Sequence, residues 1–156
     1  DCVFAGTELQ RSRHEASSFV NCTFQRASWH GASLSGCRLT GSTFTDCRLI
    51  PLTVHESDVT LVSFGGEKLS GTDLSGLRLT EANLTDADLS GCDLRDADLT
   101  GARTIGTDLS GADLRGARIE AGTWVAAKLR GARIDVAQAM LFSAAHGLVL
   151  TDDDGS

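Results

Sequence analysis

Residues 82–102 carry the pattern that decides the fold, and they read ANLTDADLSGCDLRDADLTGA. Large apolar residues recur once every five positions, at Leu84, Leu89, Leu94 and Leu99, and Ala or Cys stands two places before each of them. An α-helix repeats every 3.6 residues and a strand every two, so neither keeps this period on one face. The stretch therefore predicts a chain that turns at every repeat.

The same frame continues from Phe4 to Ile134 without slipping by one residue. The central position of each unit is large and apolar except at His14 and Thr104. The position two before it is mostly small, and the position two after it is most often Gly, which adopts turn conformations readily. Each unit therefore offers one large and one small inward side chain followed by a turn. A repeat that decides the architecture in this way is typical of solenoids.

The phenylalanines support four sides in each coil. Phe4, Phe24, Phe44 and Phe64 follow one another at intervals of 20 residues. A square coil of 20 residues would stack these rings in one ladder inside the core, and about seven such coils fit into the repeat region.

The units ANLTD, ADLSG, CDLRD, ADLTG and ADLRG resemble those of the pentapeptide-repeat family over about residues 2–134. That resemblance implies an all-β solenoid, a right-handed quadrilateral β-helix. Residues 47–66, CRLIPLTVHESDVTLVSFGG, and residues 131–150, GARIDVAQAMLFSAAHGLVL, are similar to the mycobacterial fluoroquinolone-resistance branch of the family. This finer resemblance implies a protein that binds DNA gyrase, imitates duplex DNA in shape and charge, and dimerises through its C-terminal end.

Two parts of the chain depart from the repeat. Between Ile50 and Val62 the small position holds Leu52 and Val62, so we expect a distorted coil or a kink there. After Ile134 the repeat stops, which divides the chain into a β-helix (1–134), a C-terminal helix with a short extended segment (135–150) and a frayed tail (151–156).

The C-terminal segment has the signals of a helix that begins after Asp135 and stops near Gly147. The Asp135 carboxylate can accept the free N–H groups of the first turn, and Gly is common just past a helix end. An open solenoid end must be covered, and this helix can cover it. We expect its remaining apolar face to form a dimer interface, although a helix that only caps the rod is the alternative. The residues expected at that interface are Val136, Met140, Leu141 and Phe142.

Charge is distributed unevenly along the chain, whose formal net charge is −7. Residues 67–113 hold ten acids and four bases, a net charge of −6, whereas residues 114–134 hold five bases and one acid, a net charge of +4. With 20 residues in a coil, two stripes of stacked acids form on adjacent faces, and two further acids widen the patch. The acids of the stripes are Asp73, Asp93 and Asp113, then Asp88 and Asp108, and the widening acids are Asp86 and Asp96.

Stacked like charges about 5 Å apart repel one another, so these stripes invite a functional explanation. They are interpreted as carboxylates standing where DNA phosphates would stand, facing a basic protein groove. The alternative is that Asp is common at this position because it makes turn hydrogen bonds. Asp152, Asp153 and Asp154 are expected to be a solvated tail.

No enzyme, cofactor or metal signature accompanies the repeat. The chain has no GxGxxG, Walker A or HExxH motif, and its four His and five Cys lack metal-ligand spacing. The negative charge argues against direct nucleic-acid binding. No apolar run is long enough to cross a membrane, and with no secretory signal in view, although the chain begins at Asp1 without Met, we expect a cytoplasmic location. The sequence thus predicts either a gyrase-binding DNA mimic or a structural scaffold that binds an unrelated basic partner.

Overall fold

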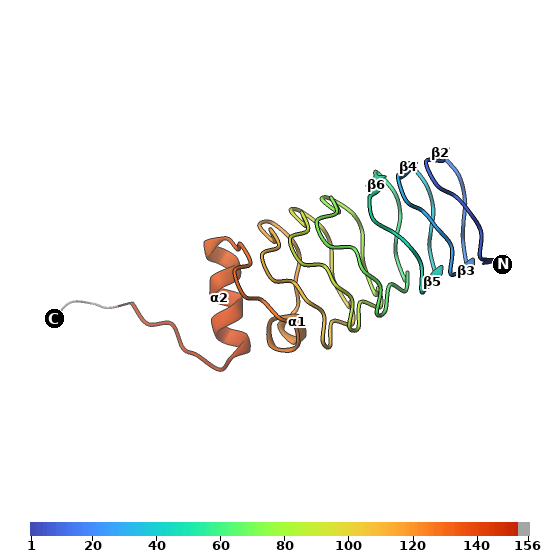
Figure 1. Ribbon diagram of the computed structural model, residues 1–156. Helices are drawn as coiled ribbons and strands as arrows, with labels where there is room; N and C mark the ends of the chain where they lie inside the picture. The colour runs from blue at the N-terminus through green and yellow to red at the C-terminus, as the bar shows by residue number, and fades with distance from the viewer. Residues whose placement is uncertain (153–156) are drawn as a thin grey trace.

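The computed structural model describes residues 1–152 as a rod of stacked coils, with the N-terminus at one end and a helix covering the other (Figure 1). Residues 153–156, and with them the expectation for Asp153 and Asp154, lie outside the described part of the chain. The strands are β1 (Val3–Ala5), β2 (Arg13–Glu15), β3 (Thr23–Gln25), β4 (Ala32–Ser35), β5 (Thr43–Thr45) and β6 (Leu52–His55). The helices are α1 (Ala121–Ala126) and α2 (Val136–Ala145).

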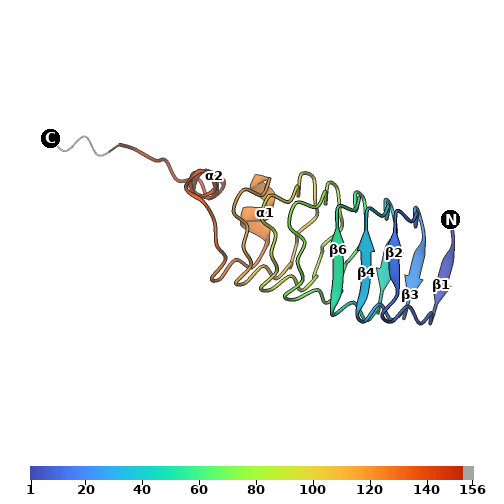
Figure 2. The ribbon, with the colours of Figure 1, turned by 90° about the horizontal axis from the view of Figure 1, so that it is seen from above.

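The strands form two parallel sheets on different sides of the rod, in the orders β1-β3-β5 and β2-β4-β6 (Figure 2). Phe4 pairs with Phe24 and Phe24 with Phe44, so neighbouring strands are offset by 20 residues. Single bridges keep the same offset as far as Asp113 and Arg133. The predicted 20-residue solenoid coil is therefore confirmed. Extended strands are confined to the half that holds more Phe and Val, which suit strands, whereas the later half holds more Asp, which does not.

The core contains the predicted aromatic ladder. The ring centroids of Phe4, Phe24, Phe44 and Phe64 are spaced at 4.9 Å from one coil to the next. The first two pairs are stacked, with interplanar angles of 9° and 18°. Beyond Phe64 the same column continues with Leu84, Thr104 and Trp124, which are all buried, while buried leucines fill most of the other three columns. Stacking of this kind adds to the free energy gained by removing the rings from water.

Small polar side chains in the interior hydrogen-bond the corners of neighbouring coils. Ser42 Oγ accepts the amide N–H of Cys22 at 3.0 Å and donates to the carbonyl of Phe19 in the same earlier coil. Thr107 Oγ1 donates to Leu84 O at 2.7 Å in the same way. Because a buried unpaired backbone group is unfavourable, these side chains explain why Ser, Thr and Cys suit the small position as well as Ala does.

The segment expected to be distorted keeps its register. Thr53 pairs with Ser33 and Asp58 with Arg38, both at the usual 20-residue offset. The Leu52 and Val62 side chains are 8% and 0% exposed, so the interior accommodates these larger residues at the small position. The Ile50–Pro51 peptide bond is cis. The irregularity is therefore local and does not interrupt the solenoid.

Helix α1 was not foreseen from the sequence, which keeps a large residue, Trp124, at the expected central position. The helix replaces one side of a coil, and Trp124 still points inward with 2% of its surface exposed. Lys128 then pairs with Asp108, so the 20-residue count is preserved. Thr104, which breaks the apolar rule, donates its hydroxyl to Thr123 Oγ1 of α1 at 3.0 Å.

Helix α2 covers the last coil and has the predicted ends. Asp135 and Gln138 form a capping box, in which each side chain accepts the other's backbone N–H at 2.9 Å. Gly147 has a φ of +74°, its N–H donates to Ala144 O, and the Leu148 N–H donates to Ser143 O. This is a Schellman arrangement, in which Gly ends the helix. In residues 1–152 no helix is long and apolar enough to cross a membrane.

Replacing Phe24 by Ala is expected to destabilise the rod by about 3–5 kcal/mol, because the ring is fully buried between Phe4 and Phe44. Urea unfolding followed by circular dichroism measures the loss. Phe4→Ala is the matched control. It also removes a phenylalanine ring, but from the partly exposed end of the ladder, so the loss of stability should be smaller. Equal effects of the two changes would contradict the ladder as the centre of the core.

Replacing Gln138 by Ala is expected to destabilise the C-terminal cap by about 1–3 kcal/mol. The side chain is buried, and its amide nitrogen donates to Leu114 O at 2.6 Å and to Ala117 O at 3.0 Å, so truncation leaves two carbonyls unpaired. Amide hydrogen exchange should quicken in α2 and the last coil but not near Phe24. The exposed Gln25 changed to Ala serves as the control, and unchanged exchange in α2 would contradict this role.

Candidate partner-binding surface

The first acidic stripe lies on one outward face of the rod. Asp73 pairs with Asp93, and Asp93 with Asp113, at the 20-residue offset. The next residue in this column is Arg133. The stripe is therefore three carboxylates long and ends on a cation at the last coil.

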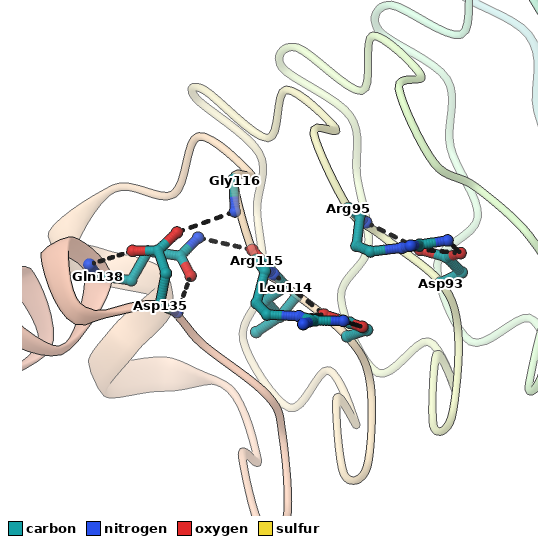
Figure 3. A network of polar contacts seen from close by, with 8 residues as sticks. Asp93, Arg95, Leu114, Arg115, Gly116, Asp135 and Gln138 are labelled. Atoms are coloured by element: carbon teal, nitrogen blue, oxygen red, sulfur yellow. Dashed lines mark hydrogen bonds and ion pairs between the residues drawn. The ribbon is translucent and has the colours of Figure 1, made fainter.

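Two of these three carboxylates are already paired with arginine (Figure 3). Arg95 Nη2 lies 2.6 Å from Asp93 Oδ2, and Arg115 Nη2 lies 2.6 Å from Asp113 Oδ2, while each arginine Nε also donates to the same carboxylate. The sequence interpretation treated Asp73, Asp93 and Asp113 as a row of bare charges, and this needs correction. Bidentate pairing neutralises Asp93 and Asp113 locally, which leaves Asp73 as the uncompensated acid of this stripe.

The ion pairs shift the carboxyl pKa values on this face. The hydrogen bonds from the Arg115 side chain lower the pKa of Asp113 to about 2. The hydrogen bonds from the Arg95 side chain lower the pKa of Asp93 in the same way. Both pairs are exposed to solvent, so they define the charge pattern of the face more than they stabilise the fold.

The second acidic stripe has no arginine partners. Asp88 pairs in register with Asp108, and the column is bounded by Lys68 before and Lys128 after. Asp88 accepts the Ser90 N–H at 3.0 Å and the Ser90 hydroxyl at 2.6 Å, and Asp108 accepts the Ser110 N–H at 2.9 Å. In residues 1–152 neither carboxylate lies within ion-pair distance of a cation. These two carboxylates are therefore better placed to meet an external basic group than Asp93 and Asp113 are.

Every aspartate of both stripes also has a structural role. Each accepts the backbone N–H two residues further on, as Asp73 does from Ser75 at 3.0 Å and Asp113 from Arg115 at 3.3 Å. Asp98, outside the stripes, makes the same contact with Thr100 at 3.0 Å. These Asx turns support the alternative that Asp occurs at this position for turn hydrogen bonding.

Asp86 and Asp96 stand at corners of the rod, where their φ angles are +56° and +59°. A methyl group added at Gly106 would collide with the Asp86 carboxylate of the preceding coil, and one at Gly116 would collide with that of Asp96. The glycines thus leave room for the acids. Asp86 lies two residues from Asp88 in the chain, at the corner beside the second stripe, and it is exposed.

A groove of about 400 Å³ runs beside the first stripe. It is hollow because Gly91 and Gly111 have no side chains at this corner, and Arg133 lies at its C-terminal end. Arg133 is exposed, and within the described chain no carboxylate lies within 4 Å of its guanidinium. This groove is a mixed surface of acids and bases, not an acidic one.

The residues expected at the dimer interface divide into two groups. Val136, Met140 and Leu141 are 80%, 54% and 55% exposed, so α2 presents them away from the rod. Phe142 does not match the expectation, because it is half-buried against its own core and its ring lies 6.0 Å from that of Trp124. Phe142 therefore belongs to the cap, where it lines an apolar cavity of about 190 Å³ with Trp124, Leu129, Ala132 and Ile134.

The segment after α2 is also apolar and exposed. Leu148, Val149 and Leu150 are 60%, 85% and 59% exposed, and this extended segment leads away from the rod (Figure 1). It adds to the apolar surface at the C-terminal end of the molecule.

The polar groups of the described chain form no metal site. Residues 1–152 contain no group of three His, Cys, Asp or Glu side chains arranged to hold a metal ion. The five cysteines are free thiols, and burial raises the pKa of Cys92 to about 11, which keeps that thiol protonated.

The arginines that modify the first stripe were overlooked in the sequence. The signal was present, because Asp93 and Arg95 are two residues apart, as are Asp113 and Arg115. An aspartate that accepts the backbone N–H two residues further on lies close to the side chain of that residue, which here is an arginine. An analysis that compares only residues 20 positions apart misses ion pairs between residues of the same coil.

Comparisons with known proteins agree with the geometry. Residues 17–50, 62–96 and 92–120 match the family described as Pentapeptide repeats, in eight copies. Pentapeptide repeat protein MfpA of Mycobacterium tuberculosis is 50% identical over 77 residues, which are 49% of this chain and 42% of that protein. The alignment thus spans less than half the length of that relative.

Solved structures share the fold at low sequence identity. QnrB1, a plasmid-mediated fluoroquinolone resistance protein, superposes with a TM-score of 0.60 at 20% identity, over 97% of this chain and 99% of that one. A pentapeptide repeat protein from the Arabidopsis thaliana thylakoid lumen gives a TM-score of 0.50 at 20% identity, over 80% of this chain and 72% of that one. The 20-residue solenoid and the matched repeats together make this chain a member of the pentapeptide-repeat family.

Proposed function

We propose that this protein is a non-enzymatic DNA mimic that binds and inhibits DNA gyrase and can protect the enzyme from fluoroquinolones. The rod would occupy a groove that normally holds duplex DNA, by competition and without chemistry. The likeness to MfpA, and to the plasmid-mediated fluoroquinolone resistance protein QnrB1, supports this proposal. A cytoplasmic location follows from the same proposal.

The observation that carries the proposal is the second stripe with its corner extension. Asp86, Asp88 and Asp108 are acids on the outside of the rod, and none has a cation within ion-pair distance in the described chain. Asp88 and Asp108 repel one another, and Lys68 and Lys128 at the ends of their column compensate this repulsion in part, so a basic surface that faces the two carboxylates is favoured. A groove lined with Lys and Arg for DNA phosphates supplies that compensation, and the attraction weakens as salt screens it.

The proposal includes a homodimer joined at the C-terminal ends. Val136, Met140 and Leu141 of α2 would meet the same residues of a second copy around a two-fold axis. Two right-handed rods of about seven coils each would then form one long acidic body with their basic last coils at its centre. The exposed apolar residues at this end support the interface.

A scaffold that binds an unrelated basic protein is the second candidate. The Asx turns favour it, because they give each aspartate of the stripes a structural reason to be present. Under this reading the acidic surface has no relation to DNA, and gyrase would be unaffected.

Gyrase supercoiling titrated with the protein tests the proposal. Changing Asp88 and Asp108 together to Asn should raise the concentration needed for half inhibition roughly fivefold at low salt, because two exposed charges facing a basic groove are lost. The Asn oxygen can still accept the turn N–H, so the fold should be retained. Added salt should reduce inhibition by the wild-type protein more than inhibition by the variant.

The matched control removes both partners of each ion pair, by changing Asp93 and Asp113 to Asn and Arg95 and Arg115 to Gln. It leaves the net charge of this face unchanged, because each lost carboxylate is matched by a lost guanidinium, so we expect a smaller effect on inhibition. Absence of inhibition by the folded wild-type protein at either salt concentration would reject the gyrase proposal and favour the scaffold.

The dimer is tested by sedimentation of a variant carrying Met140→Glu and Leu141→Glu. Two buried carboxylates should convert the dimer to a monomer at micromolar concentrations, because unpaired charges are unfavourable in an apolar interface. Leu61→Glu, at an exposed corner far along the rod, is the control and should remain dimeric. A wild-type protein that sediments as a monomer would refute this interface.

A further inference from the structure

Glu67 is a charged residue type at a position that is otherwise uncharged. It stands two places before the central Leu69, where the other repeats place Gly, Ala, Ser, Thr, Cys or a larger aliphatic residue. Its side chain points into the solenoid, and only 5% of the residue is exposed. The proposed binding to gyrase does not use this residue, so its burial requires another explanation.

One half of that explanation is a hydrogen bond to the preceding coil. The Cys47 amide N–H donates to Glu67 Oε2 at 3.0 Å. Ser42 and Ser57 accept the N–H groups of Cys22 and Cys37 in the same way, each at 3.0 Å and each from 20 residues earlier. The Glu67 carboxyl therefore makes the contact that a neutral serine hydroxyl makes in two earlier repeats.

The second part of the explanation is a hydrogen bond that the side chain at this position donates to a backbone carbonyl. Several polar side chains at this position donate to the carbonyl 23 residues earlier: Ser42 to Phe19 O, Cys47 to Phe24 O at 3.3 Å, and Thr107 to Leu84 O at 2.7 Å. The same offset from Glu67 leads to the carbonyl of Phe44. An ionised glutamate has no proton to donate, whereas a protonated one has an O–H that can.

The surroundings favour the neutral form. In residues 1–152 no cation lies within ion-pair distance of the Glu67 carboxyl. Burial raises the pKa of Glu67, and the charge of Asp46 adds to this, while N–H donation from Cys47 and Asp46 opposes it. The neighbouring titratable and charged groups are Asp46, Cys47, Arg48 and Lys68, with Asp86 and Asp88 in the following coil.

We propose that Glu67 is a pH-sensitive staple inside the rod. Its protonated carboxyl accepts the Cys47 N–H and donates to the Phe44 carbonyl, so it ties the corner at 44–47 to the next coil. When the carboxyl loses its proton, the donated hydrogen bond is lost and a charge remains buried without a cation. The staple lies where the aromatic half of the core meets the acidic half of the rod.

The sign of the pH dependence follows from the raised pKa. A carboxyl that holds its proton more tightly in the folded state stabilises that state fully below the pKa it has when unfolded. That contribution is lost as pH rises through the higher folded value. Stability conferred by the staple should therefore decline from mildly acidic toward alkaline pH.

Glu67→Gln tests the staple, because the amide has the shape of the protonated carboxyl and can also accept and donate. In thermal unfolding between pH 4.5 and pH 9, the melting temperature of the variant should rise relative to that of the wild-type protein as pH increases. The gain should be about 3–5 °C for each unit by which the folded pKa exceeds the unfolded one. Glu81→Gln, an exposed glutamate at a corner of the next coil, is the control and should show no such trend. A difference between Glu67→Gln and wild type that is independent of pH, or one that shrinks as pH rises, would overturn the proposal.

An NMR titration measures the protonation of Glu67 directly, without relying on the stability of the protein. The side-chain carboxyl carbon of Glu67, assigned by its absence in the Glu67→Gln variant, should titrate with a midpoint above the ordinary glutamate value of 4.5 in a carbon-13 NMR experiment. The carbonyl carbon resonance of Phe44 should shift over the same pH range, because that carbonyl loses the donated O–H, and it should not shift in Glu67→Gln. A midpoint at or below 4.5 would overturn the staple, and neither result depends on gyrase.

Discussion

The backbone hydrogen bond between one coil and the next is the constraint on which the rest of the structure depends. Leu74 donates its N–H to Asp93 O at 2.8 Å, and Asp93 donates its own N–H to Thr72 O at 3.1 Å, so each side of a coil is bonded to the side above it. This ladder fixes the offset at 20 residues and gives every residue a defined column of neighbours. Side chains then determine what each column does, because a solenoid coil interacts mainly with the coils beside it.

The fixed columns explain how much of the fold could be predicted. The period of five needs no tertiary information, so the inward leucines, the Phe4-to-Phe64 ladder and the capped helix after Asp135 follow from residue types alone. Helix α1 could not be found in this way, because Trp124 keeps its place in the frame whether its neighbours are helical or extended. The distortion expected at Pro51 was overestimated, since the ladder bonds on either side hold the register.

The candidate site was predicted less well than the fold for a related reason. The 20-residue spacing predicts which acids lie above one another. The net charge of the surface also depends on the residue two positions after each acid in the chain. Asp93 and Asp88 have equivalent places in their columns, yet one faces Arg95 and the other Ser90. Phe142 shows the same limit at the cap, because periodicity places it on the apolar surface of α2 without deciding which side of that surface the rod covers.

These observations separate what an acidic residue does from where it stands. Asp113 forms an Asx turn and an ion pair with Arg115, whereas Asp88 forms an Asx turn without an ion pair. Glu67 is buried at a position that other repeats fill with small uncharged residues. A count of acids along the rod treats all three alike. Since the ladder forces each into a different environment, the surface that a basic partner would meet consists of the acids the rod itself leaves uncompensated. That set excludes Asp93 and Asp113, and it includes Asp86, Asp88 and Asp108.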